Sequence, residues 1–214
     1  MTLSDAVAIV VFASVDTEYD LLSHGKRIVS RRNIGDYIMP SKPQKGLIQV
    51  YTGEGKGKTT AALGIVLRAV GQNMKVAVFQ FVKSANSVCG EHRSLQRLGI
   101  EVITRGAGFT WVETNRELNR TYSIELWDNV KDKIKSGNYN MLILDEFTYP
   151  LKFGWISIEE VKQILMSRPP QLHIVITGRD APQELIDLAD TVMEIRSIKH
   201  HLDQGIPAQQ GIEY

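Results

Sequence analysis

The glycine-rich segment VYTGEGKGKTTAALG, Val50–Gly64, constrains the fold more than any other part of the chain. It lies between an apolar run and a run with helical character, and three glycines stand at alternate positions before Lys58. The common phosphate-binding loop has the pattern G-x-x-x-x-G-K-[ST]. Here position 52 is Thr52, and the first glycine comes one residue late, at Gly53. Composition and context therefore predict a phosphate-binding loop with a variant spacing.

The residue types in this loop suit an anion. The start of a helix presents unpaired N–H groups and the positive end of the helix dipole, and glycines let the backbone turn its N–H groups toward one phosphate. We expect Lys58 to reach the phosphates, Thr59 to offer its hydroxyl to Mg²⁺ and Thr60 to add a donor. A plain glycine-rich turn with solvated lysines is the alternative, but the strand–loop–helix context favours phosphate binding. The predicted nucleotide-binding residues are Gly53, Glu54, Gly55, Lys56, Gly57, Lys58, Thr59 and Thr60.

From Leu47 onward, apolar runs alternate with helical stretches. The runs, rich in residues that favour strands, are Leu47–Tyr51, Val76–Val82, Glu101–Thr104, Met141–Asp145, Leu172–Thr177 and Thr191–Ile195. Continuous apolar runs of this length are typical of strands buried on both faces. Strands that alternate with helices predict a parallel sheet with right-handed crossovers. The sequence therefore predicts an α/β fold, a mostly parallel sheet flanked by helices, of the P-loop NTPase (RecA-like) type.

Helix signals support this reading. A helix is predicted over Lys58–Val70, and another runs through Leu188 with Pro182 in its first turn. The spacings Thr114-x-x-Glu117 and Ser157-x-x-Glu160 are those of capping boxes and predict two further helix starts. In the first of these two helices, which Gly137 ends, the residues expected to face inward are Ile124, Trp127, Val130 and Ile134; in the second they are Val161, Ile164 and Leu165.

Two acids end a buried strand in the segment MLILDEFTY, where Asp145 is followed by Glu146. Unpaired carboxylates are costly at the end of an apolar strand. Open parallel sheets bind ligands outside the carboxyl ends of their strands, and the glycine-rich loop lies at that same edge. We therefore predict a Mg²⁺ site (or Mn²⁺) made by Thr59, Glu146 and Asp145, with two surface acids as the alternative.

Composition excludes several classes of function. The 25 Lys and Arg residues balance 24 Asp and Glu residues, which argues against a nucleic acid or an anionic membrane as partner. The single cysteine, Cys89, excludes an internal disulfide and a cysteine metal cluster. The longest apolar run, Ala6–Val15, is too short to span a bilayer and has no basic residue before it. We expect a cytoplasmic protein with an N-terminal extension of unknown role (residues 1–45) and one domain over residues 46–214.

Four further motifs narrow the range of functions that the chain can have. They are DEFTY at Asp145–Tyr149, GFTW at Gly108–Trp111, ITGRDAP at Ile176–Pro182, and the tail KHHLDQGIPAQQGIEY at Lys199–Tyr214. Together with the glycine-rich loop they resemble the P-loop family of corrinoid adenosyltransferases. The resemblance covers about Gly46–Tyr214, and its GFTW and tail motifs are far more specific than the phosphate loop. His200 stands at the Lys-His position of the family tail.

This resemblance implies a reaction. Co(I) of a corrinoid attacks C5′ of ATP, adenosylcobalamin or adenosylcobinamide forms, and tripolyphosphate leaves. Lys58, Phe109 and Trp111 are then the catalytic residues, and the two aromatic side chains displace the lower axial ligand of the corrinoid. The resemblance also implies ATP and the corrinoid as substrates, an electron-donating flavoprotein and a homodimer. One departure is Glu54, where the family usually has Asn.

Two other functions are compatible with the residues alone. A RecA-like ATPase would use the Asp145–Glu146 pair to hold magnesium and activate water, and a non-catalytic module would bind nucleotide or corrinoid without turnover. The GFTW segment favours the transferase, because an ATPase has no evident use for it. Lys83 and Arg179 follow strands at the carboxyl edge of the predicted sheet, where they contact either ligand or solvent. Trp127 and Trp155 are expected to be packing residues.

Overall fold

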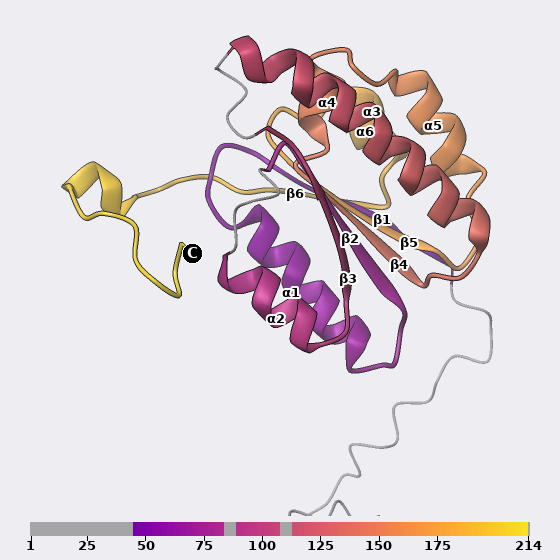
Figure 1. Ribbon diagram of the computed structural model, residues 1–214, viewed down its shortest axis with the longest axis horizontal. Coiled ribbons are helices and arrows are strands. Elements are labelled where there is room, and N and C mark those ends of the chain that lie inside the picture. Colours follow the sequence, from indigo (N-terminus) through magenta and orange to yellow (C-terminus); the bar gives the residue numbers. More distant parts are fainter. Residues whose placement is uncertain (1–44, 84–88, 108–112, 214) are drawn as a thin grey trace, which may run out of the picture. The chain divides into compact units, whose positions relative to one another are not determined.

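A six-stranded, fully parallel sheet forms the centre of the computed structural model, which describes residues 45–83, 89–107 and 113–213 (Figure 1). Its strands are β1 (Ile48–Thr52), β2 (Val76–Phe81), β3 (Glu101–Arg105), β4 (Met141–Asp145), β5 (His173–Thr177) and β6 (Thr191–Glu194). Their order is β3-β2-β4-β5-β1-β6. Because every strand runs in the same direction, their carboxyl ends meet at one edge. The predicted α/β class is confirmed.

Helices cover both faces of the sheet. They are α1 (Lys58–Val70), α2 (Gly90–Arg97), α3 (Glu113–Ser136), α4 (Thr148–Lys152), α5 (Ile158–Met166) and α6 (Gln183–Leu188), and a 3-10 turn, η1 (His201–Gln204), lies in the tail. Figure 1 shows α1 and α2 on one face and α3 to α6 on the other. The crossovers that parallel pairing requires explain this layering.

Two apolar cores result, one on each face. Alternate residues of one strand point to opposite faces, so Leu142 packs with α3 and α5 while its neighbour Ile143 packs with α1. The first core contains Trp127 and Phe147, whose ring centroids lie 5.1 Å apart. The second contains Ala62 and other small residues of α1. The central strands are thereby shielded from water, and polar groups gather at the carboxyl edge of the sheet.

The buried stripe of α3 differs from the prediction at one position. Trp127, Val130 and Ile134 are buried as expected, but Ile124 is 40% exposed. Leu126 takes the inward position instead, and the stripe continues toward the N-terminus through the polar residues Ser123 and Asn119. The inward face was misplaced because it includes polar residues, which the apolar pattern counts as exposed. Ile124 lies one residue beyond the buried Ser123, and one residue along a helix turns a side chain by about 100°.

Edge position and local caps account for other differences. The edge strands β3 and β6 are not buried on both faces, because each pairs with only one neighbour. Helices α2 and α4 and the turn η1 were not predicted. The helix α3 begins at Glu113, before Thr114. Ser157 precedes α5 as expected, but its hydroxyl contacts Glu159, so the predicted capping box with Glu160 does not form.

Some predictions fall on residues that the structure does not describe. These include Phe109 and Trp111, almost all of the extension 1–45, and the last residue of the tail. Within the described ranges, no helix combines the length and apolar character that a membrane span needs. The predicted domain of residues 46–214 remains an expectation.

Candidate functional site at the carboxyl edge of the sheet

The glycine-rich loop connects β1 to α1 at this edge and packs against the backbone that follows β6. A Cβ atom on Gly53 would lie 2.5 Å from the carbonyl oxygen of Ile195, and one on Gly55 would lie 2.7 Å from the carbonyl carbon of Arg196. The amide of Gly55 donates to the carbonyl of Ile195 at 2.7 Å. Glycine is therefore required here by close backbone approach, and the positive φ of Gly53 and Gly57 (99° and 111°) adds to that requirement.

Lys58 turns back into its own loop. Its ammonium donates to the carbonyl oxygens of Gly53 and Gly55, both at 2.7 Å, and the residue is only 7% exposed. Burial lowers the pKa of Lys58, although the nearby carboxylates Glu146, Glu54 and Asp145 oppose that effect. The loop thus holds a cation at its centre, where a phosphate oxygen can replace the carbonyl oxygens as acceptor.

Asp145 lies at the end of β4 with both carboxylate oxygens occupied. Oδ1 accepts from the hydroxyls of Thr59 and Thr177, each at 2.7 Å. Oδ2 faces the ammonium of Lys83 at 2.9 Å and accepts from Gln80 at 3.3 Å. The residue is 1% exposed, and these four donors offset the cost of its burial.

Glu146 has the opposite environment. Its φ of 58° places it in the left-handed region, and its amide donates to the hydroxyl of Thr177 at 2.9 Å. Among the residues that the structure describes, its buried Oε2 has no hydrogen-bond partner. Burial and the neighbouring charge of Asp145 raise the pKa of Glu146. The free carboxylate oxygen of Glu146 and the hydroxyl of Thr59 lie at the same edge of the sheet, and together they form a donor set that fits a hard divalent cation. The strained backbone of Glu146 is consistent with a functional position.

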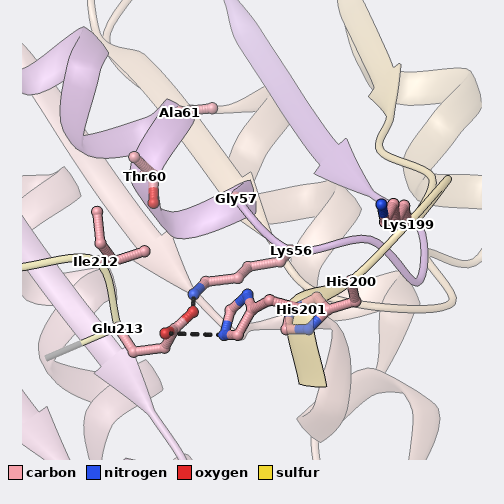
Figure 2. Close-up of a pocket in the computed structure, with 9 residues that line it drawn as sticks. All are labelled: Lys56, Gly57, Thr60, Ala61, Lys199, His200, His201, Ile212 and Glu213. Atoms are coloured by element: carbon pink, nitrogen blue, oxygen red, sulfur yellow. Dashed lines mark ion pairs between the residues drawn. The ribbon is translucent and has the colours of Figure 1, made fainter. Parts of the chain in front are cut away.

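The C-terminal tail makes a cavity with the outer side of the glycine-rich loop. Figure 2 shows this cavity of about 610 Å³, lined by Lys56, Gly57, Thr60, Ala61, Lys199, His200, His201, Ile212 and Glu213. The Lys56 ammonium contacts the Glu213 carboxylate, whose other oxygen lies 3.3 Å from Nε2 of His201. Two segments more than 130 residues apart in sequence therefore line one cavity.

Glu54 is paired in the structure. The guanidinium of Arg179, which follows β5, donates to its carboxylate at 2.8 Å. Both side chains are at least half exposed. The Glu54 carboxylate is therefore balanced by a cation at the same edge, and Arg179 faces the loop and not bulk solvent alone.

The structure brings together Lys58, Thr59, Asp145 and Glu146, as the parallel-strand argument predicted. Lys56 was grouped with the phosphate-binding residues, but its side chain reaches the tail at Glu213. Sequence reasoning missed Thr177, Gln80 and the tail residues His201 and Glu213. One signal existed: Gln80 is a polar residue inside the apolar run VAVFQFV, and it is fully buried.

Comparison with known proteins decides the family. A family model described as "ATP:corrinoid adenosyltransferase BtuR/CobO/CobP" matches residues 44–214. The chain belongs to this corrinoid adenosyltransferase family. A corrinoid adenosyltransferase of Escherichia coli (strain K12) is 41% identical over 177 residues, covering 83% of this chain and 90% of the relative. The corrinoid adenosyltransferase CobA of Salmonella typhimurium is 40% identical with the same coverage.

A third relative extends the similarity further toward the N-terminus. A corrinoid adenosyltransferase of Sinorhizobium sp is 36% identical over 202 residues, which cover 92% of this chain and 94% of the relative. Residues 46–214 make up a smaller share of the chain than that, so this alignment enters the first 45 residues. The resemblance read from the motifs is thereby confirmed at the level of the family.

Proposed function

We propose that this protein transfers the 5′-deoxyadenosyl group of ATP to Co(I) of a corrinoid, with tripolyphosphate as the leaving group. The observation that carries the proposal is the coincidence of family membership with the loop geometry: Lys58, Thr59 and Glu146 converge at one edge of the sheet. The names of the relatives support the same reaction for those proteins, and the chain contains the motifs that suggested it.

In the proposed reaction, the electron pair of Co(I) forms a bond to C5′ of the ribose. The C5′–O bond breaks, and its electron pair leaves with the tripolyphosphate. Co(I) is already a strong nucleophile, so the protein contributes orientation and charge neutralisation. We assign the triphosphate to the amides of the Gly53–Thr60 loop and to Lys58, whose ammonium exchanges its two carbonyl acceptors for phosphate oxygens.

The residues at the edge also fit a Mg²⁺ ion, or Mn²⁺. We assign Thr59 and Glu146 as its protein ligands, with Asp145 beside them. When bound, the cation neutralises charge on the triphosphate and on its leaving form. The Thr59 hydroxyl donates a hydrogen bond to Asp145, so the lone pairs of its oxygen stay available for the cation. The buried, unpartnered Oε2 of Glu146 supports its role as ligand.

Three finer parts of the proposal rest on the resemblance: the role of Phe109 and Trp111, the flavoprotein and the homodimer. Phe109 and Trp111 displace the lower axial ligand of the corrinoid, so that Co(II) accepts an electron more readily. A flavoprotein supplies that electron, and the enzyme works as a homodimer. We place the reaction in the cytoplasm, because a reducing compartment suits the Co(I) state and the lone cysteine.

One assay tests the proposed function. Corrinoid that has been chemically reduced to Co(I) is mixed with the full-length protein and MgATP, and the absorbance change and the phosphate products are recorded. We expect an adenosylated corrinoid and tripolyphosphate in equal amounts. ADP and inorganic phosphate would identify an ATPase, and ATP binding without any product would identify a non-catalytic module. Either result would overturn the proposal.

A further inference from the structure

Lys83 lies immediately beyond β2 and bridges two acids. Its ammonium is 2.9 Å from Oδ2 of Asp145 and 2.9 Å from Oε1 of Glu91. The turn that aims it is unusual: Val82 has a φ of 67°, and the amide of Lys83 donates to the carbonyl of Phe81 at 2.7 Å. A valine in the left-handed region is strained, so the surrounding structure must hold this turn in place.

Glu91, in the first turn of α2, is the second anchor of Lys83. Its carboxylate also accepts from the side-chain amide nitrogen of Gln80 at 3.1 Å. The side-chain oxygen Oε1 of Gln80 accepts from the hydroxyl of Thr104 on β3 at 3.0 Å and contacts His92. Burial by itself would lower the pKa of Lys83, but the charges of Asp145 and Glu91 raise it well above its ordinary value. Lys83 is therefore a permanent cation fixed by β2, β4 and α2.

The donors of this network are distributed unequally between the two neighbouring acids. Asp145 receives two hydroxyls, an amide and an ammonium, whereas Oε2 of Glu146 receives no donor from the described residues. A divalent cation that approached Oδ2 of Asp145 would have to displace the ammonium of Lys83 at 2.9 Å. Oε2 of Glu146 presents no such competitor.

We infer that Lys83, anchored by Glu91, is a positioning residue that keeps Asp145 bound to protein donors and so leaves Glu146 as the acid that takes the divalent cation. The inference rests on the proposed function, because it concerns the metal that accompanies ATP. It gives the two acids different roles, with Asp145 bound to protein donors and Glu146 to the cation, and it assigns a role to Lys83 and to the helix α2.

A mutant cycle tests this without measuring turnover. The magnesium enhancement is defined as the ratio of the ATP dissociation constants in EDTA and in excess Mg²⁺, measured by calorimetry on the full-length protein. Glu146→Gln is introduced into the wild type and into the Lys83→Met, Lys83→Arg and Glu91→Gln backgrounds. Lys131→Met is the matched control background, because Lys131 also bridges two acids and is similarly exposed (23% against 29%) but lies on α3.

In the wild-type, Lys83→Arg and Lys131→Met backgrounds, we expect Glu146→Gln to reduce the magnesium enhancement about tenfold or more. In the Lys83→Met background we expect a loss of less than about threefold, because Asp145, released from the ammonium, then takes the cation itself. The Glu91→Gln background, which keeps the ammonium and removes one anchor, should give an intermediate loss. It also serves if Lys83→Met does not fold.

Two results would overturn the inference in distinguishable ways. The same loss in all backgrounds, even with a lowered melting temperature for Lys83→Met, would mean that Lys83 is only a structural ion pair, and the proposed metal site would stand. An ATP affinity in wild type that does not depend on Mg²⁺ would reject the proposed metal site and the inference with it.

Discussion

The ammonium of Lys58 is the clearest case of one residue prepared for a ligand. It donates to two carbonyl groups of its own loop and is almost fully buried. The carbonyl acceptors are neutral, whereas phosphate oxygens are charged and form stronger hydrogen bonds with an ammonium, so a phosphate can replace the carbonyls with a net gain. The packing of Gly53 and Gly55 against the segment after β6 gives the loop a defined shape before any nucleotide is bound.

Replacement of Lys58 by alanine should weaken ATP binding by roughly 10- to 100-fold, since one charge-assisted contact contributes about 1.5–3 kcal/mol. The melting temperature should change little, because the loop backbone keeps its contacts with the segment after β6. Calorimetric titration with MgATP measures the effect. Lys75→Ala is the control: Lys75 precedes β2, at the opposite end of that strand from the site, and its ammonium packs on the ring of Tyr139. Unchanged affinity in Lys58→Ala would contradict the assignment.

A second prediction at this scale concerns Glu54. The Glu54→Asn change removes an anion beside the triphosphate site and frees Arg179, so ATP should bind about two- to tenfold more tightly. Glu117→Gln, on an exposed face of α3, is the charge-matched control and should have no effect. The same titration decides the matter. Weaker binding in Glu54→Asn would show that Glu54 itself contacts the nucleotide.

Between secondary-structure elements, the tightest restraint near the site is the contact of Gly178, which follows β5, with Thr148, the first residue of α4. Gly178 has a φ of 145°, and a Cβ atom there would lie 2.0 Å from the hydroxyl oxygen of Thr148. Thr148 is fully buried two residues beyond Glu146. This contact therefore sets where the chain turns after the two acids, and it links the geometry of the site to the packing of two elements.

We predict that Gly178→Ala destabilises the protein by about 2–4 kcal/mol, because overpacking and an unfavourable φ act together. Denaturant unfolding followed by circular dichroism gives the value. Gly64→Ala is the control: the position lies inside α1 with open space around its Cβ, so alanine should stabilise by about 0.5–1 kcal/mol. If the two variants were equally stable, the contact between β5 and α4 would not be restrictive.

For the protein as a whole, the acids at the carboxyl edge lower the stability of the metal-free fold at neutral pH, although the same acids suit a bound cation. Glu146 is held in a place where burial and Asp145 raise its pKa. In the unfolded chain it ionises at its ordinary pKa. As pH rises from that value through the folded pKa, the unfolded state loses its proton first, so the metal-free protein loses stability.

The Glu146→Gln variant removes this loss. In EDTA we expect it to be more stable than wild type at neutral pH, with a difference that vanishes as pH falls below the ordinary glutamate pKa near 4.5. Denaturant unfolding at a series of pH values checks the trend. Glu160→Gln, on α5, controls for the loss of a partly exposed acid that has protein partners. A difference that grew toward acid pH would contradict the stated direction of the pKa shift.

Much of this architecture follows from local patterns. The runs around Val50, Val78 and Ile143 predict parallel strands because buried strands need continuous apolar residues. Once the strands are parallel, Lys58 and Glu146 must meet at one edge. Helix faces were predicted less well, as Ile124 shows, because the inward face of α3 carries polar residues that periodicity counts as exposed.

The sheet, the phosphate-type loop, the acids at the end of β4 and the family motifs could be predicted from the sequence, because each is encoded in neighbouring residues. Three features depend on the tertiary contacts. Both oxygens of Asp145 have partners while Oε2 of Glu146 has none among the described residues, Lys83 links α2 to the site, and Glu213 contacts Lys56. These contacts join residues far apart in the chain. Their geometry depends on how side chains from different elements share a few donors, and no local pattern records that.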